Sequence, residues 1–256
     1  MTAELMSRNL KLVTYNLQNG IQSRQLVKNI EKMADEGANV FCFQEFRKFE
    51  ERLFVGEKIR ESFSDGWGID YFLNENTHDL GLCIMWKKSE LDLVKTEKLF
   101  LPKIEKLHKT IEVLEKVFFD RRLPVQRGAL VADFKAGNIL VRVANVHLDW
   151  IGGTEHKASQ LRSLVCHLEK KNNVTHEVVC GDFNTVGPLG LLRRRRERIL
   201  SAFAGKFIEA SSEMRLTSHT FQKLDYIFSR GFKKAQAERF FLFGSDHMPL
   251  LAKFDF

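Results

Sequence analysis

Apolar residues change their spacing along the first part of the chain, and the change marks successive elements. Residues 10–15 form a short β-rich run, and apolar positions then recur at helical spacing over 23–36, with Gly37 placed to stop the helix. A continuous apolar run over 40–43 is typical of a strand that is covered on both faces. The pattern predicts a strand, a helix and a second strand in direct succession.

The remaining segments predict a mixture of hairpins and helical crossovers. Turn-forming residues fill 135–138, so 129–134 and 139–146 are expected to pair as an antiparallel hairpin. Helical spacing recurs over 155–171 and 189–203. The other β-rich runs, bounded by turn-type residues, are 68–73, 82–86, 91–98, 177–180, 224–228, 236–243 and 250–254. This mixture predicts an α/β fold of two sheets with helices outside them.

Residues 103–118 interrupt this pattern with one amphipathic segment. Its isoleucine, leucine and phenylalanine side chains share one helical face, and lysine and glutamate share the other. The segment fits a lid that faces a substrate, and it also fits a helix that covers a sheet edge. The apolar face favours the second interpretation.

Composition indicates a single domain. The chain of 256 residues is 44% hydrophobic, has only 4 prolines and contains no stretch that resembles a linker. We expect one domain over 10–256 after a flexible N-terminus, 1–9. That N-terminus lacks the apolar core of a secretory signal, and no apolar run is long enough to span a membrane, so a cytoplasmic location is expected. No coiled-coil seam is visible, which favours a monomer.

The cysteines do not predict a metal site. Cys42, Cys83, Cys166 and Cys180 show none of the paired short spacings that zinc sites use. Three of them, Cys42, Cys83 and Cys180, lie inside apolar runs, so we expect buried thiols rather than disulfides.

The chain is basic, with a net charge of +7 and a pI near 9.2, which is consistent with a polyanionic partner. Arg193 to Arg196 and Arg198 form a cluster within the helix predicted over 189–203. These arginines could contact a phosphate backbone or form a solvated helix face. Because four successive residues point to all sides of a helix, only some of them could face a substrate.

Polar residues cluster at the ends of five predicted strands. They are Asn16, Glu45, His147, the pair Asp182 and Asn184, and the pair Asp246 and His247. Loops at strand ends are where a rigid scaffold presents catalytic groups, although a lone Asp or Asn there is usually only a turn former.

His247 is the clearest candidate for proton transfer. Asp246 and His247 precede an apolar strand, and Asp225 could orient the imidazole, so that the histidine acts as an acid or a base near neutral pH. The alternatives are a hydrogen-bonded loop histidine and a strand-edge aspartate paired with a lysine.

These motifs, in this order, resemble the signature of the endonuclease/exonuclease/phosphatase superfamily, which includes DNase I and exonuclease III. The matching segments span nearly the whole chain: Thr14-Tyr15-Asn16, Gln44-Glu45, Asn145-Val146-His147-Leu148, Gly181-Asp182-Phe183-Asn184, Leu224-Asp225-Tyr226 and Ser245-Asp246-His247.

The resemblance implies a four-layered α/β/β/α sandwich with a Mg²⁺ site at one end, where Mn²⁺ could substitute. By family analogy the metal is held by Glu45, with Asn16 and Asp246 nearby, since Mg²⁺ prefers oxygen ligands and keeps several waters. The resemblance assigns catalytic roles to Asp182, Asn184, His147, His247 and Asp225. Proposed mechanisms in the family exchange the roles of the aspartate and the histidines, and the sequence leaves that choice open.

Two further residues are candidates for substrate binding. Arg127 matches a family position that touches phosphate. A planar guanidinium can donate hydrogen bonds to two phosphate oxygens at once. A surface arginine beside a turn is nearly as good an interpretation. Trp150 follows His147, where its ring could stack on a base or close the core.

Three functions remain open. The first is a Mg²⁺-dependent phosphodiesterase acting on DNA or RNA. The second is a phosphatase or phosphodiesterase of phosphoinositide, sphingomyelin-like or other small phosphate esters. The third is a binding module that keeps the fold without the chemistry, which the presence of every acidic, amide and histidine position argues against.

Overall fold

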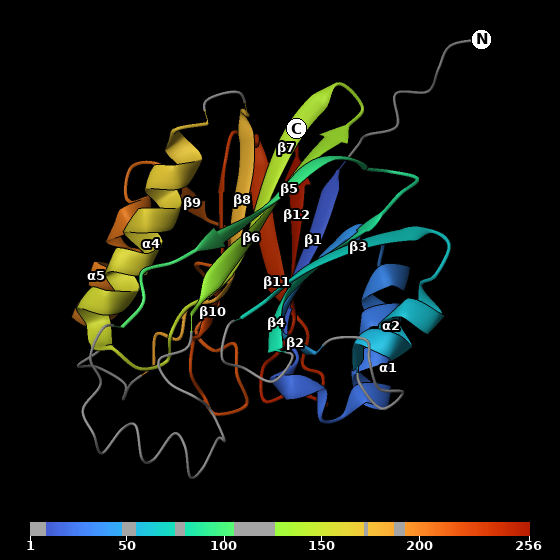
Figure 1. Cartoon of the computed structure of the whole chain (residues 1–256), viewed down its shortest axis with the longest axis horizontal. Helices are drawn as coiled ribbons and strands as arrows, with labels where there is room; N and C mark the ends of the chain where they lie inside the picture. The colour runs from blue at the N-terminus through green and yellow to red at the C-terminus, as the bar shows by residue number, and fades with distance from the viewer. Residues whose placement is uncertain (1–8, 48–54, 75–79, 105–125, 172–173, 187–192) are drawn as a thin grey trace.

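Two β-sheets pack face to face and carry helices on their outer sides, as the computed structural model shows (Figure 1). The structure describes residues 9–47, 55–74, 80–104, 126–171, 174–186 and 193–256. The α/β/β/α layering confirms the predicted four-layered sandwich.

The first sheet has six strands in the order β11-β12-β1-β2-β4-β3. Its strands are β1 (Leu10–Asn16), β2 (Val40–Arg47), β3 (Trp67–Leu73), β4 (Leu80–Lys87), β11 (Lys234–Arg239) and β12 (Leu250–Asp255). β1 and β2 are parallel, and the other pairs are antiparallel.

The second sheet also has six strands, in the order β5-β6-β7-β8-β10-β9. Its strands are β5 (Asp92–Phe100), β6 (Gly128–Ala136), β7 (Ile139–His147), β8 (His176–Asp182), β9 (Ile208–Glu209) and β10 (Asp225–Arg230). The only parallel pair among the described strands of this sheet is β7 with β8. Each sheet therefore contains one parallel pair joined by a helical crossover.

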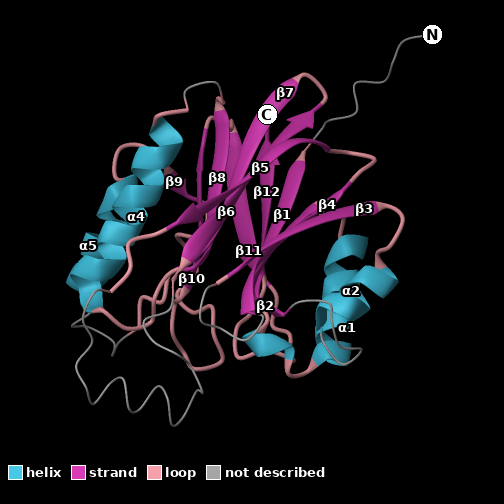
Figure 2. Ribbon diagram, in the orientation of Figure 1, coloured by secondary structure: helices cyan, strands magenta, loops and turns pink. Residues whose placement is uncertain are grey.

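The crossover helices cover the outer faces of the sheets (Figure 2). On the first sheet lie α1 (Ser23–Asp35) and α2 (Val55–Ser62); on the second lie α4 (Gly153–Glu169), α5 (Arg193–Leu200) and the 3-10 turn Ser201–Phe203. The apolar stripes of α1 and α4 are buried as their spacing predicts. One apolar core lies between the sheets, and one lies beneath the helices on each side.

Most predicted elements are confirmed, with three differences. The strand predicted over 236–243 is wrong beyond Arg239, because the facing strand begins only after Pro249, which has no N–H to extend the ladder. The helix α2 and the two-residue strand β9 have no counterpart in the sequence-based prediction. Most of 103–118, the start of the helix predicted over 189–203, and nearly all of the N-terminal 1–9 lie outside the described residues.

The predicted burial of three cysteines is confirmed. Cys42, Cys83 and Cys180 are buried free thiols, and Cys166 is exposed. Within the described ranges, no helix has the length and apolar character needed to cross a membrane.

Buried amides join the two sheets directly below the strand ends. The Asn145 amide of β7 donates to the carbonyl oxygens of Phe43 (2.8 Å) and Cys83 (2.9 Å) in the first sheet. Gln44 returns a hydrogen bond to Asn145 Oδ1 over 2.7 Å, and both side chains are fully buried. Because a buried polar group costs free energy unless it is paired, these bonds fix how one sheet lies on the other.

We expect Asn145→Leu to lower the free energy of unfolding by about 2–4 kcal/mol, because it leaves buried groups of the first sheet without partners. Urea denaturation measures this loss. The matched control is Gln236→Leu, the same change from amide to leucine at an exposed strand position, which should stay within about 0.5 kcal/mol. Equal effects of the two variants would contradict a role for Asn145 in joining the sheets.

Candidate active site

The two parallel strand pairs end beside each other and supply most of the predicted site residues. β1 ends at Asn16, opposite Gln44 of β2, and β7 ends at His147, opposite Asp182 of β8. Asp182 also lies opposite Asp225 of the antiparallel strand β10. Carboxyl ends of parallel strands are the usual place for a ligand site in an open α/β sheet.

Asp182 is the centre of this arrangement. Its Oδ2 accepts a hydrogen bond from Asn16 Nδ2 (3.0 Å) across the two sheets, and its Oδ1 accepts one from the backbone N–H of Asn184 (2.8 Å). The Nε2 atoms of His147 and His247 lie 3.5 and 3.8 Å from the same Oδ2. Asp182 is only 2% exposed, so residues from both sheets surround one buried carboxylate.

His247 is held by Asp225, as the sequence predicts. The Nδ1 atom of His247 lies 2.9 Å from Asp225 Oδ2 and 3.1 Å from Oδ1. The backbone also fixes this loop, because Ser245 Oγ donates to the Asn16 carbonyl (2.7 Å) and accepts from the His247 N–H (3.1 Å). The alternative in which Asp225 pairs with a lysine at the strand edge is therefore wrong.

The pKa values of both Asp182 and His247 are raised, for different reasons. Burial raises the pKa of Asp182 to about 7, with Asp225 adding to the rise while His247 and the Asn184 N–H oppose it. Burial alone would lower the pKa of His247, but the carboxylates of Asp225 and Asp182 outweigh it and raise the pKa to about 10. At neutral pH the imidazole is a cation, and the Asp182 carboxylate can take up a proton.

Glu45 and Asp246 supply the other carboxylates. Glu45 occupies a β-bulge of β2 in a left-handed conformation (φ 53°), which is uncommon for a residue with a side chain. No hydrogen bond or ion pair occupies its carboxylate in the part of the chain that the structure describes. Its charge reaches Asp182, whose pKa it raises, and Asp246 in turn raises the pKa of His247.

The donor set around Glu45 suits a hard cation. The carboxylates of Glu45 and Asp246 and the amide of Asn16 offer oxygen atoms, and the Asn16 oxygen already accepts the Gln18 N–H over 2.9 Å. No three His, Cys, Asp or Glu side chains among the described residues are grouped so as to hold a metal ion by themselves. Mg²⁺ needs only one or two carboxylates when waters and substrate phosphate complete its shell, so these residues fit it.

Arg127 lies inside the protein, behind His147. Its Nη1 donates to His147 Nδ1 (3.4 Å), its Nε donates to Asp149 Oδ1 (3.2 Å), and it is 5% exposed, so the alternative of a surface arginine is wrong. Because an arginine side chain only donates, Nδ1 of His147 accepts, which leaves the ring proton on Nε2, the atom that faces Asp182. His156 and Gln160 hold Asp149 in turn.

Lys157 is a buried residue of the site that the sequence-based prediction missed. Its Nζ donates to the carbonyl oxygens of Asn184 (2.7 Å) and Trp150 (3.0 Å), and burial lowers the pKa of this lysine to about 8. Trp150, at the rim, is 41% exposed, so it does not close the core. The helical spacing carries a signal for this burial, because Lys157 lies on the same face of α4 as the buried Leu161 and Leu164.

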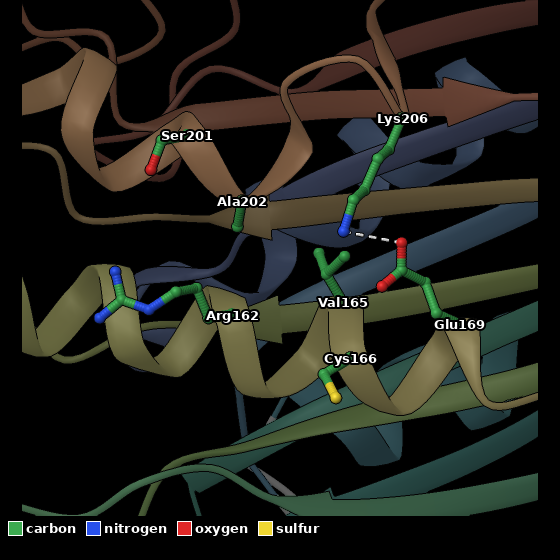
Figure 3. A pocket seen from close by; sticks show the side chains of 7 residues that line it. All are labelled: Arg162, Val165, Cys166, Glu169, Ser201, Ala202 and Lys206. Carbon is green, nitrogen blue, oxygen red and sulfur yellow. Dashed lines mark ion pairs between the residues drawn. The ribbon is translucent and has the colours of Figure 1, made fainter.

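One hollow on the outer side of the second sheet lies away from these residues. Figure 3 shows it between α4 and the segment 201–206, with a volume of about 330 Å³ and an ion pair of 2.8 Å between Lys206 and Glu169 at its edge. None of the predicted site residues lines it. This hollow is therefore separate from the candidate site.

We expect the imidazole of His247 to remain protonated well above pH 8, because two carboxylates face it. NMR titration of the ring in EDTA would follow this, and Asp225→Asn should lower the pKa by at least about one unit. The contribution of this charge to the free energy of unfolding is complete below the ordinary histidine pKa of about 6.5. It is lost as the pH rises towards 10. His176, whose pKa is lowered by burial, is the internal control. Joint titration of both rings near pH 6.5 would contradict the assignment.

Comparison with solved structures shows the same fold at low sequence identity. The endonuclease/exonuclease/phosphatase from Bacteroides vulgatus has a TM-score of 0.70 at 16% identity, covering 96% of this chain and 98% of that one. The human Nocturnin catalytic domain with a bound sulfate anion has a TM-score of 0.68 at 17% identity, covering 99% and 96%. D. rerio TDP2 complexed with single strand DNA product has a TM-score of 0.68 at 11% identity, covering 97% and 99%.

The family assignment comes from a model of aligned sequences rather than from these likenesses. No curated protein matches the chain at a significant level. The model of the Endonuclease/Exonuclease/phosphatase family matches residues 13–247, a span that contains Asn16, Glu45, His147, Asp182 and His247. This chain therefore belongs to the endonuclease/exonuclease/phosphatase family, whose members are phosphoester hydrolases.

Proposed function

We propose that this protein is a divalent-metal-dependent phosphodiesterase that cuts nucleic acid by attack of water on phosphate. The observation that carries the proposal is geometric: Asn16, His147, Asn184 and His247 all surround the buried carboxylate of Asp182 at the ends of two sheets. This set contains a base, an amide and two imidazoles within reach of one phosphate, as hydrolysis of a phosphate ester requires.

Asp182 acts as the base that accepts a proton from the attacking water. Hydrogen bonds from Asn16 and the Asn184 backbone hold both carboxylate oxygens in place. A pKa near 7 matches a base that works at neutral pH, since it balances ionisation against proton affinity. The neighbouring His247 is already protonated, which supports the assignment of the base to Asp182.

The histidines stabilise charge on the phosphate. His247, kept cationic by Asp225, faces the centre and can bind a phosphoryl oxygen or donate a proton to the leaving group. His147 presents its Nε2 proton to the same space, and Arg127 fixes its ring from behind. The contact of Arg127 with phosphate that the sequence suggested is replaced here by a positioning role.

Mg²⁺, or Mn²⁺ in its place, would be held by Glu45 with Asp246 and the Asn16 oxygen. When bound, the ion polarises the phosphoryl oxygen and offsets its charge. The carboxylate of Glu45, in the bulge of β2, has no partner among the described residues, which supports this ligand set.

Nucleic acid is the substrate class that the charge favours. The net charge of +7 and the arginines of α5 attract a polyanion. D. rerio TDP2, which shares the fold, is known in complex with a single strand DNA product. We further propose a cytoplasmic monomer.

Phosphate esters of lipids are the second candidate, and one observation favours them. The phenyl rings of Phe221, Phe241 and Phe243 are each more than 60% exposed, and Phe241 and Phe243 pack on His219 in the loops that flank Asp246. An exposed apolar patch of this kind suits contact with a lipid surface.

Mg²⁺-dependent nicking of plasmid DNA, or cleavage of single-stranded DNA or RNA, is the expected activity. Asp182→Asn should lower the turnover number about a thousandfold because it removes the base. Asp65→Asn, the same change at an exposed position, is the control and should retain activity. Phosphoinositides, sphingomyelin and small phosphate esters are assayed beside the nucleic acids. Activity confined to those esters would reject the nucleic-acid proposal.

We expect Glu45→Gln to weaken Mg²⁺ binding at least about tenfold, measured by titration calorimetry and by the Mg²⁺ concentration that half-activates the enzyme. Glu31→Gln, an exposed change on α1, is the matched control. Unchanged Mg²⁺ affinity in Glu45→Gln would remove this residue from the ligand set.

A further inference from the structure

A second, smaller cavity adjoins the reaction centre between α4, α5 and the segment after Asn184. Its volume is about 280 Å³, and its lining includes Trp150, Thr154, Lys157, Thr185, Arg195 and Arg196. α4 and α5 lie side by side on the outer face of the second sheet (Figure 1).

Two lining residues connect this cavity to the candidate site. Thr185, in its wall, directly follows Asn184, whose side chain donates to the Leu148 carbonyl over 2.9 Å. Lys157 bridges the two regions, since its Nζ donates to the carbonyl oxygens of both Asn184 and Trp150. A ligand in the cavity would therefore lie next to a phosphate that is bound at Asp182.

The charged side chains that line the cavity are all cations: Lys157, Arg195 and Arg196. Elsewhere on α5, Arg193 pairs with Glu197 (2.8 Å) and Arg198 pairs with Glu155 (2.9 Å). Among the described residues no hydrogen bond or ion pair engages Arg195. A guanidinium with open donors at the mouth of a cationic cavity suits a phosphate group.

The cavity also offers an aromatic face and limited space. Trp150 is one of its lining residues and is 41% exposed. A base can stack on such a ring whatever its identity. A volume of about 280 Å³ lies near the lower limit of roughly 300 Å³ for small-molecule sites, which leaves room for one nucleotide and not for a base pair.

We propose that this cavity binds one unpaired nucleotide of the substrate strand next to the scissile phosphate, with its base on Trp150 and its phosphate on Arg195 and Arg196. The inference rests on the proposed function and narrows it to nucleic acid that is single-stranded at this position. Arg195 and Arg196 thereby become the members of the arginine cluster that contact substrate.

Binding of a labelled single-stranded oligonucleotide, followed by fluorescence anisotropy in the Asp182→Asn background, tests the phosphate contacts. Removing both guanidinium groups by Arg195→Ala with Arg196→Ala should reduce the slope of log affinity against log salt by about 1.4, since each lost contact contributes about 0.7. Arg193→Ala with Arg194→Ala removes equal charge from the same helix outside the cavity and should leave the slope nearly unchanged. Replacing Arg195 and Arg196 by lysine should restore the slope. Equal slopes for the two alanine pairs would overturn the proposal.

The stacking contact has its own test. Trp150→Ala should weaken binding of the single strand about 5- to 150-fold and change binding of the matching duplex less than about twofold. Equal weakening of both would overturn the role of Trp150. Cleavage by the wild-type protein is measured in parallel. If the wild-type protein cleaves nucleic acid but the cavity variants bind it as the wild type does, this inference alone is rejected. If the wild-type protein neither binds nor cleaves nucleic acid, the proposed function is rejected as well.

Discussion

The hydrogen bond between Asn16 and Asp182 joins the two sheets at the candidate site. It spans 3.0 Å between side chains that are 1% and 2% exposed. A buried carboxylate is costly unless several donors face it, and here the donors come from both halves of the chain. The sheets must therefore meet in one register for the site to exist.

Buried amides enforce that register from below. Asn145 reaches two carbonyl groups of the first sheet, and Gln44 donates to Asn145 in return. An apolar interface alone would tolerate sliding, because hydrophobic contact has little directionality. Directional hydrogen bonds in the core remove that freedom, so the strand ends carry their side chains to fixed positions.

Charge then divides the roles among groups that are chemically similar. Asp182 and Asp225 lie opposite each other on β8 and β10. Asp225 is hydrogen-bonded to His247 Nδ1, whereas Asp182 is hydrogen-bonded to Asn16 and to the Asn184 backbone. The shared histidine stays cationic because both carboxylates favour its proton, and burial makes Asp182 hold a proton more readily than an exposed aspartate. Behind His147, Arg127 contacts both its ring and the carboxylate of Asp149.

The sequence by itself determined the elements and the motifs, because both depend on local order. Helical spacing identified α1 and α4, β-rich runs bounded by turn residues identified most strands, and the ordered polar motifs identified the family. Only the tertiary structure decided that β11 ends at Arg239 and that Lys157 is buried against Asn184. It also decided that Arg195 and Arg196 line a cavity while Arg193 and Arg198 pair with glutamates. Those outcomes depend on partners distant in the chain, and residue spacing carries no information about which distant groups will meet.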